Sequence, residues 1–274
     1  MYLTCKRPAL LTLSKIIQQI IEWLYLFARV PSPSKAQIDN LKIVAHRGWH
    51  DNKVVFENTL KSFDLAYLNN IYGIEFDVRW TKDLVPVIHH DPKLGRVFKG
   101  DQKIIDINFS DLRLRYPLIP TLGEVVQKYG GKIHFFIELK DEPYLKVSEQ
   151  KQTLQQILQE LKVQEDFHFL VLKKGPLELL SDFPKSSVLL VANQNFREMS
   201  QLAIDESWGG ICGHYHFIDD EMLKHHRSHG QKVGTGFPKT MKPLKKELSR
   251  DIDWIFTNHP GTLAQLCSKM EVSN

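Results

Sequence analysis

The 274-residue sequence contains few cysteines, and they follow no recognisable pattern. Cys5, Cys212 and Cys267 are odd in number, lie far apart and lack the short spacing of a zinc site. A small fold held together by disulfides would need more of them. We therefore expect free thiols and a cytoplasmic location.

A long hydrophobic run free of charge is also missing. Residues 9–29 could span a bilayer by length, but Lys15, Gln18, Gln19 and Glu22 interrupt them. Charge at that depth is costly, and no small-residue cleavage site indicates a signal peptide. The polar spacing favours an amphipathic helix. This helix either packs on the barrel or a second subunit, or it makes peripheral membrane contact. The oligomeric state stays open.

Charge of one sign does not dominate the sequence. Lys and Arg number 36 against 32 Asp and Glu, for a net charge of +4. That is too little for the dense basic stripe of a nucleic-acid binder, so we expect no nucleic-acid partner. A mild basic excess instead favours a small anionic substrate.

Strand and helix patterns alternate after a Pro/Ser linker at residues 30–37. Such alternation predicts a parallel sheet, and eight repeats predict an α/β fold closed into a (β/α)8 TIM barrel. We therefore expect an N-terminal helical extension with its linker at residues 1–40, and the barrel at 41–274. The predicted strands are "LKIVAH", "GIEFDV", "KIHFFIEL", "FHFLVL", "SVLLVA", "GGICGH", "KVGTGF" and "DWIFTN".

A short insertion is expected after the second strand. "VRWTKDLVPVIHHD" predicts a hairpin, and residues from about 92 to 118 form the insertion above the barrel mouth. "PTLGEVVQKYG" predicts the returning helix, with Thr121 as its N-cap and Gly130 as its stop.

Charged residues stand at the ends of three apolar strands, where TIM barrels carry their active sites. Glu75 and Asp77 are two apart and share one face of a strand, and Glu138 faces the same space. Three carboxylates suit one hard divalent cation, Mg²⁺ or Ca²⁺. The alternative is a purely structural ion network with neighbouring arginines and Lys140.

Two histidines complete a constellation suited to phosphoryl chemistry. A four-residue hairpin turn at 82–85 would place Asp77 opposite His90, so that His90 faces the acids together with His46. A slip of one residue would substitute His89. Two imidazoles can act as base and acid near neutral pH. Two cations, Arg47 and Lys140, would hold a phosphate.

The ordered motifs resemble the glycerophosphodiester phosphodiesterase family from Ile43 to the C-terminus. They are "AHRG", "ENTLKSF", "IEFDVRWTKDLVPVIHHD", "IPTLGEVV", "FIELK" and "IFTNHP". The resemblance implies hydrolysis of a glycerophosphodiester to glycerol 3-phosphate and an alcohol. The attacking group is either water or the substrate's own hydroxyl.

The resemblance also implies roles for individual residues. His46 and His90 match the catalytic histidines, and Arg47, Lys140 and Glu57 match residues at the phosphate. Glu57 and Asn58 would organise the loop that carries Arg47. The matching ligands of one divalent cation are Glu75, Asp77 and Glu138.

Four departures from the family pattern fall in loops at the pocket rim. Leu84 replaces a glycine, Asn258 replaces an aspartate, and residues 97–101 and 234–239 differ from the usual Thr-rich and Trp-Thr elements. They leave the released alcohol open. Two alternative functions remain: lysophospholipase-D-like hydrolysis at a membrane surface, and an inactive barrel used as a binding module.

Three further segments receive plain structural interpretations. "GHYHF" at 213–217 could add polar groups to the mouth. "HHRSHG" at 225–230 is expected to be a solvated helix end, where basic residues suit the helix dipole. "KPLKKE" at 242–247 is expected to be an exposed charge run.

Overall fold

A computed structural model describes residues 30–270, so the amphipathic helix and membrane contact predicted at residues 9–29 lie outside the described residues. Within the described range, no helix is both long and apolar enough to cross a bilayer. The strands are β1 (Ile43–His46), β2 (Gly73–Trp80), β3 (Pro86–Ile88), β4 (His134–Leu139), β5 (Phe167–Val171), β6 (Val188–Ala192), β7 (Gly210–His214), β8 (Lys232–Gly236) and β9 (Trp254–Thr257).

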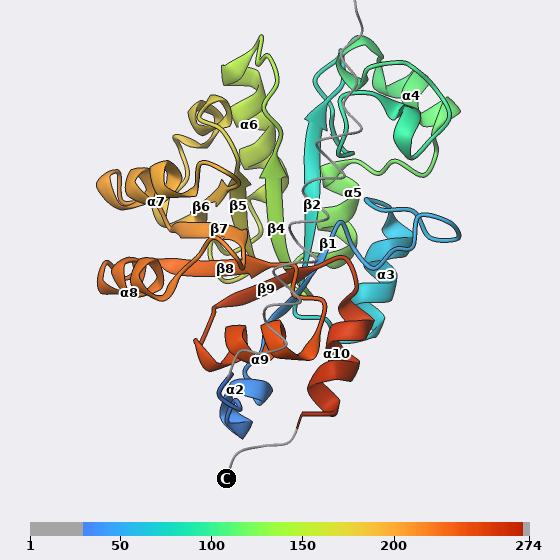
Figure 1. Cartoon of the computed structure of the whole chain (residues 1–274). Coiled ribbons are helices and arrows are strands. Elements are labelled where there is room, and N and C mark those ends of the chain that lie inside the picture. Colours follow the sequence, from blue (N-terminus) through green and yellow to red (C-terminus); the bar gives the residue numbers. More distant parts are fainter. Residues whose placement is uncertain (1–29, 271–274) are drawn as a thin grey trace, which may run out of the picture.

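Eight of these strands form a closed parallel barrel. Each parallel strand pairs with its neighbours in the order β1-β9-β8-β7-β6-β5-β4-β2, and β1 also pairs with β2, which closes the ring. The ninth strand, β3, pairs antiparallel with β2 and is not part of this ring. Every predicted strand is present, and the predicted TIM barrel is confirmed (Figure 1).

Helices between the strands surround the barrel. The α-helices are α2 (Lys35–Asp39), α3 (Leu60–Leu68), α4 (Phe109–Arg115), α5 (Leu122–Tyr129), α6 (Val147–Leu158), α7 (Phe196–Asp205), α8 (Asp220–Ser228), α9 (Met241–Ser249) and α10 (Pro260–Ser268). Short 3₁₀ turns are η1 (Leu94–Arg96), η2 (Ile104–Asp106), η3 (Gly175–Leu180) and η4 (Lys185–Ser187).

Strand alternation sorts the side chains into two cores. On β4, Phe135 and Ile137 belong to the large cluster that the helices cover, whereas Phe136 belongs to a smaller cluster inside the barrel. Because side chains on a strand alternate between faces, Glu138 follows Phe136 to the inner side. By the same rule His46 follows Val44 inward on β1. The inner core therefore ends in polar groups at the carboxyl ends of the strands.

The segment between β3 and α5 packs around a small core of its own. This cluster includes Leu94, Ile104, Ile107, Leu112 and Ile119. The segment contains η1, η2 and α4, and it lies beside the end of β2 (Figure 1).

Three predictions about the linker and the helices were wrong. The linker at 30–37 contains the start of α2, where Ser34 forms a capping box with Gln37. The charge run at 242–247 lies in α9, and Leu244 and Glu247 are buried. In the expected solvated helix end, His226 is buried instead.

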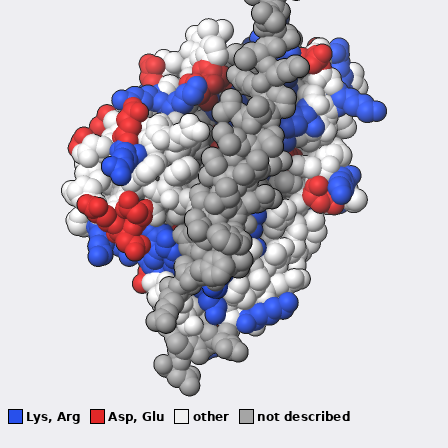
Figure 2. Space-filling view, viewed as in Figure 1, with Lys and Arg blue, Asp and Glu red and all other residues white. Residues whose placement is uncertain are grey.

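The cause of His226's burial is a pair of inward hydrogen bonds. Its Nε2 lies 2.8 Å from Ser200 Oγ of α7, and its Nδ1 lies 2.6 Å from Gln231 Oε1. Helical spacing turns this histidine toward α7, while the side chain of His225 stays exposed. On the face drawn in Figure 2, basic and acidic side chains are interspersed over the visible described surface.

Candidate active site

Three acidic side chains meet at the carboxyl ends of β2 and β4. Strand register places Asp77 beside Glu138, and it places Glu75 beside His46 of β1. One carboxylate oxygen from each acid lies within 4.8 Å of the others. Their exposed fractions are 1% for Glu75, 0% for Asp77 and 8% for Glu138.

Burial and mutual repulsion act strongly on these acids. Burial, and then the charge of Asp77, raise the pKa of Glu75 and of Glu138 above the ordinary value. Burial opposes ionisation of Asp77 as well, but Lys140 and Arg47 outweigh it and hold the pKa of Asp77 far below the usual range. A cation at the cluster would relieve the repulsion between the acids.

The donor set suits a hard divalent cation. All three groups are carboxylates, which Mg²⁺ and Ca²⁺ prefer as ligands. Among the described residues, buried Glu75 Oε1 has no hydrogen-bond partner. An unpaired buried oxygen is costly, and a bound cation would remove that cost.

Two basic side chains contact the same acids. Arg47 Nε lies 3.3 Å from Asp77 Oδ2, and Lys140 Nζ lies 2.6 Å from Asp77 Oδ1 and also contacts Glu138. The backbone N–H of Arg47 donates to Glu75 Oε2 at 2.9 Å. The structural ion network considered from sequence is thus present. Its ion pairs reach Asp77 and Glu138, whereas Glu75 accepts the backbone N–H of Arg47.

The loop after β1 owes its shape to left-handed residues. Arg47 and Gly48 have φ values of 59° and 78°, and a Cβ at Gly48 would lie only 2.4 Å from Ser62 Oγ. Asn58, with φ 57°, donates its backbone N–H to the Arg47 carbonyl at 3.0 Å. Its side-chain amide donates to Asp77 Oδ2 at 2.7 Å. Asn58 therefore joins the Arg47 loop to the acid cluster.

Glu57 holds the arginines of the site. Its carboxylate accepts from Arg47 Nη1 at 2.9 Å, from Asn52 at 2.7 Å, and from both terminal nitrogens of Arg96 at 2.6 and 2.9 Å. Burial opposes its ionisation, but these donors hold the pKa of Glu57 well below the usual range. Glu57 is connected to the acid cluster through Arg47. It therefore orients Arg47 and does not itself face the acids.

His46 lies between the acid cluster and the last strand of the barrel. Its Nε2 is 3.7 Å from Glu75 Oε2, and its Nδ1 is 2.6 Å from Asn258 Oδ1. The edge of Phe237 packs against the ring at 5.0 Å. Burial, and then the charge of Arg47, lower the pKa of His46 to about 3, so the ring is neutral near pH 7. With Nδ1–H donating to Asn258, the lone pair stands on Nε2.

The predicted hairpin register was wrong by one residue. Trp80 pairs with Pro86, so Asp77 lies opposite His89, whose N–H donates to the Asp77 carbonyl at 2.9 Å. The turn has three residues instead of four, because Leu84 adopts a left-handed conformation with φ 62°. That conformation is uncommon for a residue with a large side chain, which explains why the sequence did not reveal it.

The charged groups of the site nevertheless act on His90, because β3 ends at Ile88 and the chain then bends. Burial lowers the pKa of His90, and the next largest influences are the charges of Asp77, Lys140 and Arg47. His89 turns away instead. Its Nε2 lies 3.3 Å from the Lys93 carbonyl, and its ring lies 6.0 Å from that of Phe98. The assignment of His90 as catalytic stays a prediction.

Sequence reasoning missed the residues that orient the histidines. Asp91 Oδ1 lies 2.7 Å from His90 Nδ1, and its other oxygen contacts Arg96. Asn258 was noted only as a departure from the family pattern. The adjacent letters "HHD" and "TNHP" were the available signals, because each places a hydrogen-bonding side chain next to a strand end.

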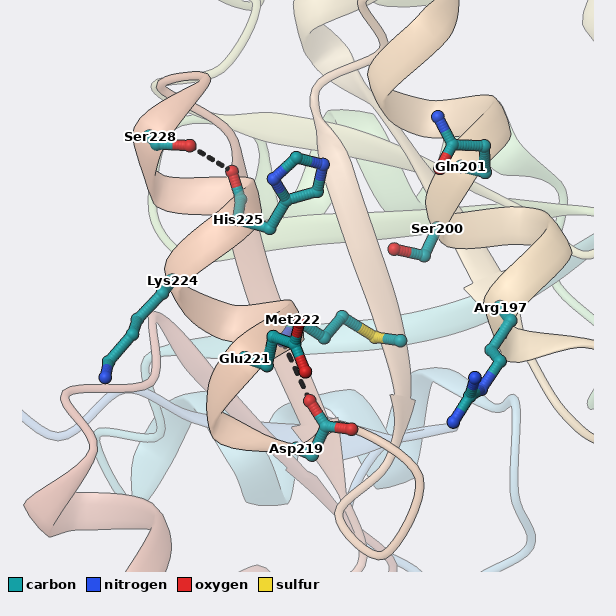
Figure 3. A pocket seen from close by; sticks show the side chains of 9 residues that line it. All are labelled: Arg197, Ser200, Gln201, Asp219, Glu221, Met222, Lys224, His225 and Ser228. Carbon is teal, nitrogen blue, oxygen red and sulfur yellow. Dashed lines mark hydrogen bonds between the residues drawn. The ribbon is translucent and has the colours of Figure 1, made fainter.

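Two cavities differ in their relation to the acids. One of about 140 Å³ is lined by His46, Glu75 and Glu138 together with residues at the ends of β5 to β9. A larger groove of about 650 Å³ lies between α7 and α8 (Figure 3). None of the predicted site residues lines this groove. Two of its polar groups serve local structure, since Asp219 caps α8 and Ser228 Oγ donates to the His225 carbonyl.

The chain is similar in sequence to known glycerophosphodiester phosphodiesterases. Residues 46–195 match the model of the glycerophosphoryl diester phosphodiesterase family. Glycerophosphodiester phosphodiesterase 1 of Bos taurus is 31% identical over 140 residues, which cover 44% of this chain and 41% of that protein. The chain thus spans less than half the length of this relative. A Bacillus subtilis glycerophosphodiester phosphodiesterase is 25% identical over 86% of this chain and 90% of its own length.

Solved structures share the fold. A glycerophosphodiester phosphodiesterase from Thermotoga maritima has a TM-score of 0.69 at 24% identity, covering 82% of this chain and 98% of its own. A phosphodiesterase from Oleispira antarctica, solved with the product sn-glycerol-3-phosphate, has a TM-score of 0.68 at 23% identity. That match covers 85% of this chain and 99% of the other.

Proposed function

Because the chain belongs to the glycerophosphoryl diester phosphodiesterase family, we propose that it hydrolyses glycerophosphodiesters to glycerol 3-phosphate and an alcohol. One observation carries the proposal. Three buried carboxylates gather at the carboxyl end of the barrel, in contact with two cations and an imidazole. The product bound by the Oleispira antarctica phosphodiesterase agrees with it.

Glu75, Asp77 and Glu138 would hold one divalent cation. When bound, such a cation supplies positive charge to a non-bridging phosphate oxygen. The close approach of the three carboxylates and the unpaired Glu75 Oε1 support this assignment. Mg²⁺ and Ca²⁺ both fit the oxygen donors.

Arg47 and Lys140 would bind the phosphate beside the cation. Arg47 is fixed at its Nη1 by Glu57, so its guanidinium fork is oriented before substrate arrives. Lys140 is a compact positive charge between Asp77 and Glu138. Together they attract the anionic diester and oppose the repulsion that the acids exert on it.

The two histidines would move the protons. His46 carries a lone pair on Nε2 and takes the proton of the attacking water or hydroxyl as the bond to phosphorus forms. His90 lies 2.7 Å from Asp91 and, in its protonated form, gives a proton to the alcohol oxygen as the P–O bond breaks. The protons then exchange with solvent, which restores both rings.

The test is release of glycerol 3-phosphate by purified protein, with Glu75→Gln compared with wild type. We expect a loss of more than about 100-fold, since residues that merely orient metal ligands already contribute 10–100-fold. Chelator should abolish turnover, and added Mg²⁺ or Ca²⁺ should restore it.

The matched control is Glu165→Gln, which changes a glutamate exposed to solvent. This variant should keep wild-type turnover. Calorimetric titration with Mg²⁺ and Ca²⁺ should show binding to wild type and to the control, and weaker binding to Glu75→Gln. Full activity of Glu75→Gln in the presence of chelator would refute the cation site.

A further inference from the structure

Polar and apolar residues together line the small cavity beside the acids. His46, Glu75 and Glu138 are among the polar ones. The apolar ones come from strand ends and the residue after β8, and they are Leu170, Val191, Ala192, Cys212, Phe237 and Phe256. Arg47 and Lys140 do not line this cavity. A phosphate would meet carboxylates there without either cation, so the cavity suits an uncharged part of the substrate.

The size of the cavity restricts that part to a small group. Its volume is about 140 Å³. Glycerol is the small part that every glycerophosphodiester shares, whereas the released alcohol varies in size and needs an open path. The carbon chain of glycerol can pack on the apolar lining residues, and its hydroxyls then need hydrogen-bond partners, because an unpaired buried hydroxyl is costly.

The cavity has several hydrogen-bond acceptors but few half-buried hydrogen-bond donors. Glu75 and Glu138 offer carboxylate oxygens, and the Nδ1–H of His46 already donates to Asn258. His214 also lines the cavity, at the end of β7 where it pairs with Gly236 of β8. Its side chain is the candidate donor to a substrate oxygen.

The local contacts of His214 fix both its ring and its proton. The His216 backbone N–H donates to His214 Nδ1 at 3.4 Å. The ring stacks on that of Tyr215 at 4.8 Å and 25°. Burial, and then Lys239, lower the pKa of His214 to about 4, so it is neutral near pH 7. With Nδ1 accepting, the neutral ring carries its hydrogen on Nε2 as a donor.

We propose that this cavity receives the glycerol group, and that His214 Nε2 donates a hydrogen bond to its terminal hydroxyl, the one farthest from phosphorus. The inference rests on the proposed function. It assigns a role to the "GHYHF" segment, whose contribution to the barrel mouth the sequence left open. It also connects glycerol binding to the proposed base, because the ring centroid of Phe237 lies 5.0 Å from that of His46 and 6.3 Å from that of His214.

The test compares two esters that share one leaving group. Glyceryl 4-nitrophenyl phosphate carries both glycerol hydroxyls, and 2-hydroxypropyl 4-nitrophenyl phosphate lacks only the terminal one. Both keep the hydroxyl that could attack phosphorus. For wild type we expect kcat/KM to favour the glyceryl ester by about 10- to 100-fold, the value of one lost hydrogen bond in a buried site.

His214→Phe should abolish most of this preference by slowing the glyceryl ester alone. His214→Gln retains an N–H donor and should keep part of the preference. The matched control is His225→Phe on α8, in the groove of Figure 3, which should keep the wild-type ratio. Thermal melting checks that all three variants fold.

Three outcomes would overturn the inference. Equal loss on both esters in His214→Phe would make the ring purely structural. Unchanged kcat/KM for both esters in His214→Phe would remove the terminal hydroxyl from contact with this ring. No turnover of the glyceryl ester by wild type would overturn the proposed function and this inference together.

Discussion

At the scale of single residues, the proposed base depends on its hydrogen bond to Asn258. That bond, 2.6 Å long, keeps the hydrogen of His46 on Nδ1 and the lone pair on Nε2. In Asn258→Leu the acceptor is lost and the ring can place its hydrogen on Nε2, where it cannot take a proton. We expect kcat to fall about 10- to 100-fold with a smaller change in KM, measured by steady-state kinetics.

Asn258→Asp provides the control, because it keeps an acceptor at the same position. It should retain much more activity than Asn258→Leu. Equal losses in the two variants would show that the hydrogen bond to His46 does not orient the base.

Sequence could indicate the charged residues of the site but not all of their contacts. The acids and Lys140 stand at the ends of apolar strands, where their burial requires a partner, so their position alone was informative. The choice between His89 and His90 depended on a turn conformation at Leu84 that few large side chains adopt. Asn258 lies 212 residues from His46, so its place after a strand end could indicate a site residue but not its pairing with His46.

At the scale of elements, α5 shows how a local motif fixes a helix start near the site. Thr121 Oγ1 accepts the Glu124 N–H at 3.1 Å, and the Glu124 side chain accepts the Thr121 N–H at 2.7 Å. Thr121→Ala removes one half of this capping box. We expect the free energy of unfolding to fall by about 1 kcal/mol, measured by urea denaturation.

The comparison variant is Thr240→Ala, at the N-cap of α9, where no side-chain cap hydrogen bond is present. It should lower the free energy of unfolding by less than Thr121→Ala does. A loss in Thr240→Ala as large as that in Thr121→Ala would mean that the capping hydrogen bond contributes nothing specific.

Elements with a strong periodic pattern were predictable, and short or highly charged ones were not. α5 has both a cap signal and an apolar face, and the sequence revealed it. α9 is rich in lysine, and its buried side is limited to Pro243, Leu244, Glu247 and Leu248. Burial of Glu247 depends on Arg250, which lies 2.9 Å away, and such tertiary pairing overrides the composition of the segment.

At the scale of the whole molecule, eight apolar runs were enough to predict the closed barrel. Its strands are buried on both faces, so their sequences are continuous and hydrophobic. The polar interior at the opposite end from the acids was not predicted. There His134 Nε2 and His168 Nδ1 lie 2.9 Å apart, and both rings are buried.

This histidine pair should make stability depend on pH. Burial lowers the pKa of His134 to about 4, and burial and then His134 lower that of His168 to about 3. Both rings titrate near 6.5 when unfolded, so below that pH the unfolded chain binds more protons and folding is opposed. The contribution of the pair to the free energy of unfolding is fully present above pH 6.5 and is lost as pH falls. At pH 4 the loss from one such ring is roughly 3 kcal/mol.

Urea denaturation of wild type between pH 7 and 4 should therefore show a falling free energy of unfolding. Carboxylates contribute in the same range, so the decisive comparison is with a double variant, His134→Phe with His168→Phe. Aromatic rings already pack there, since Phe136 stacks on His168 at 5.9 Å and 14°. The double variant should lose less stability than wild type over this range. Parallel curves for the two proteins would show that the pair contributes no pH dependence, because any shared slope must then come from other groups.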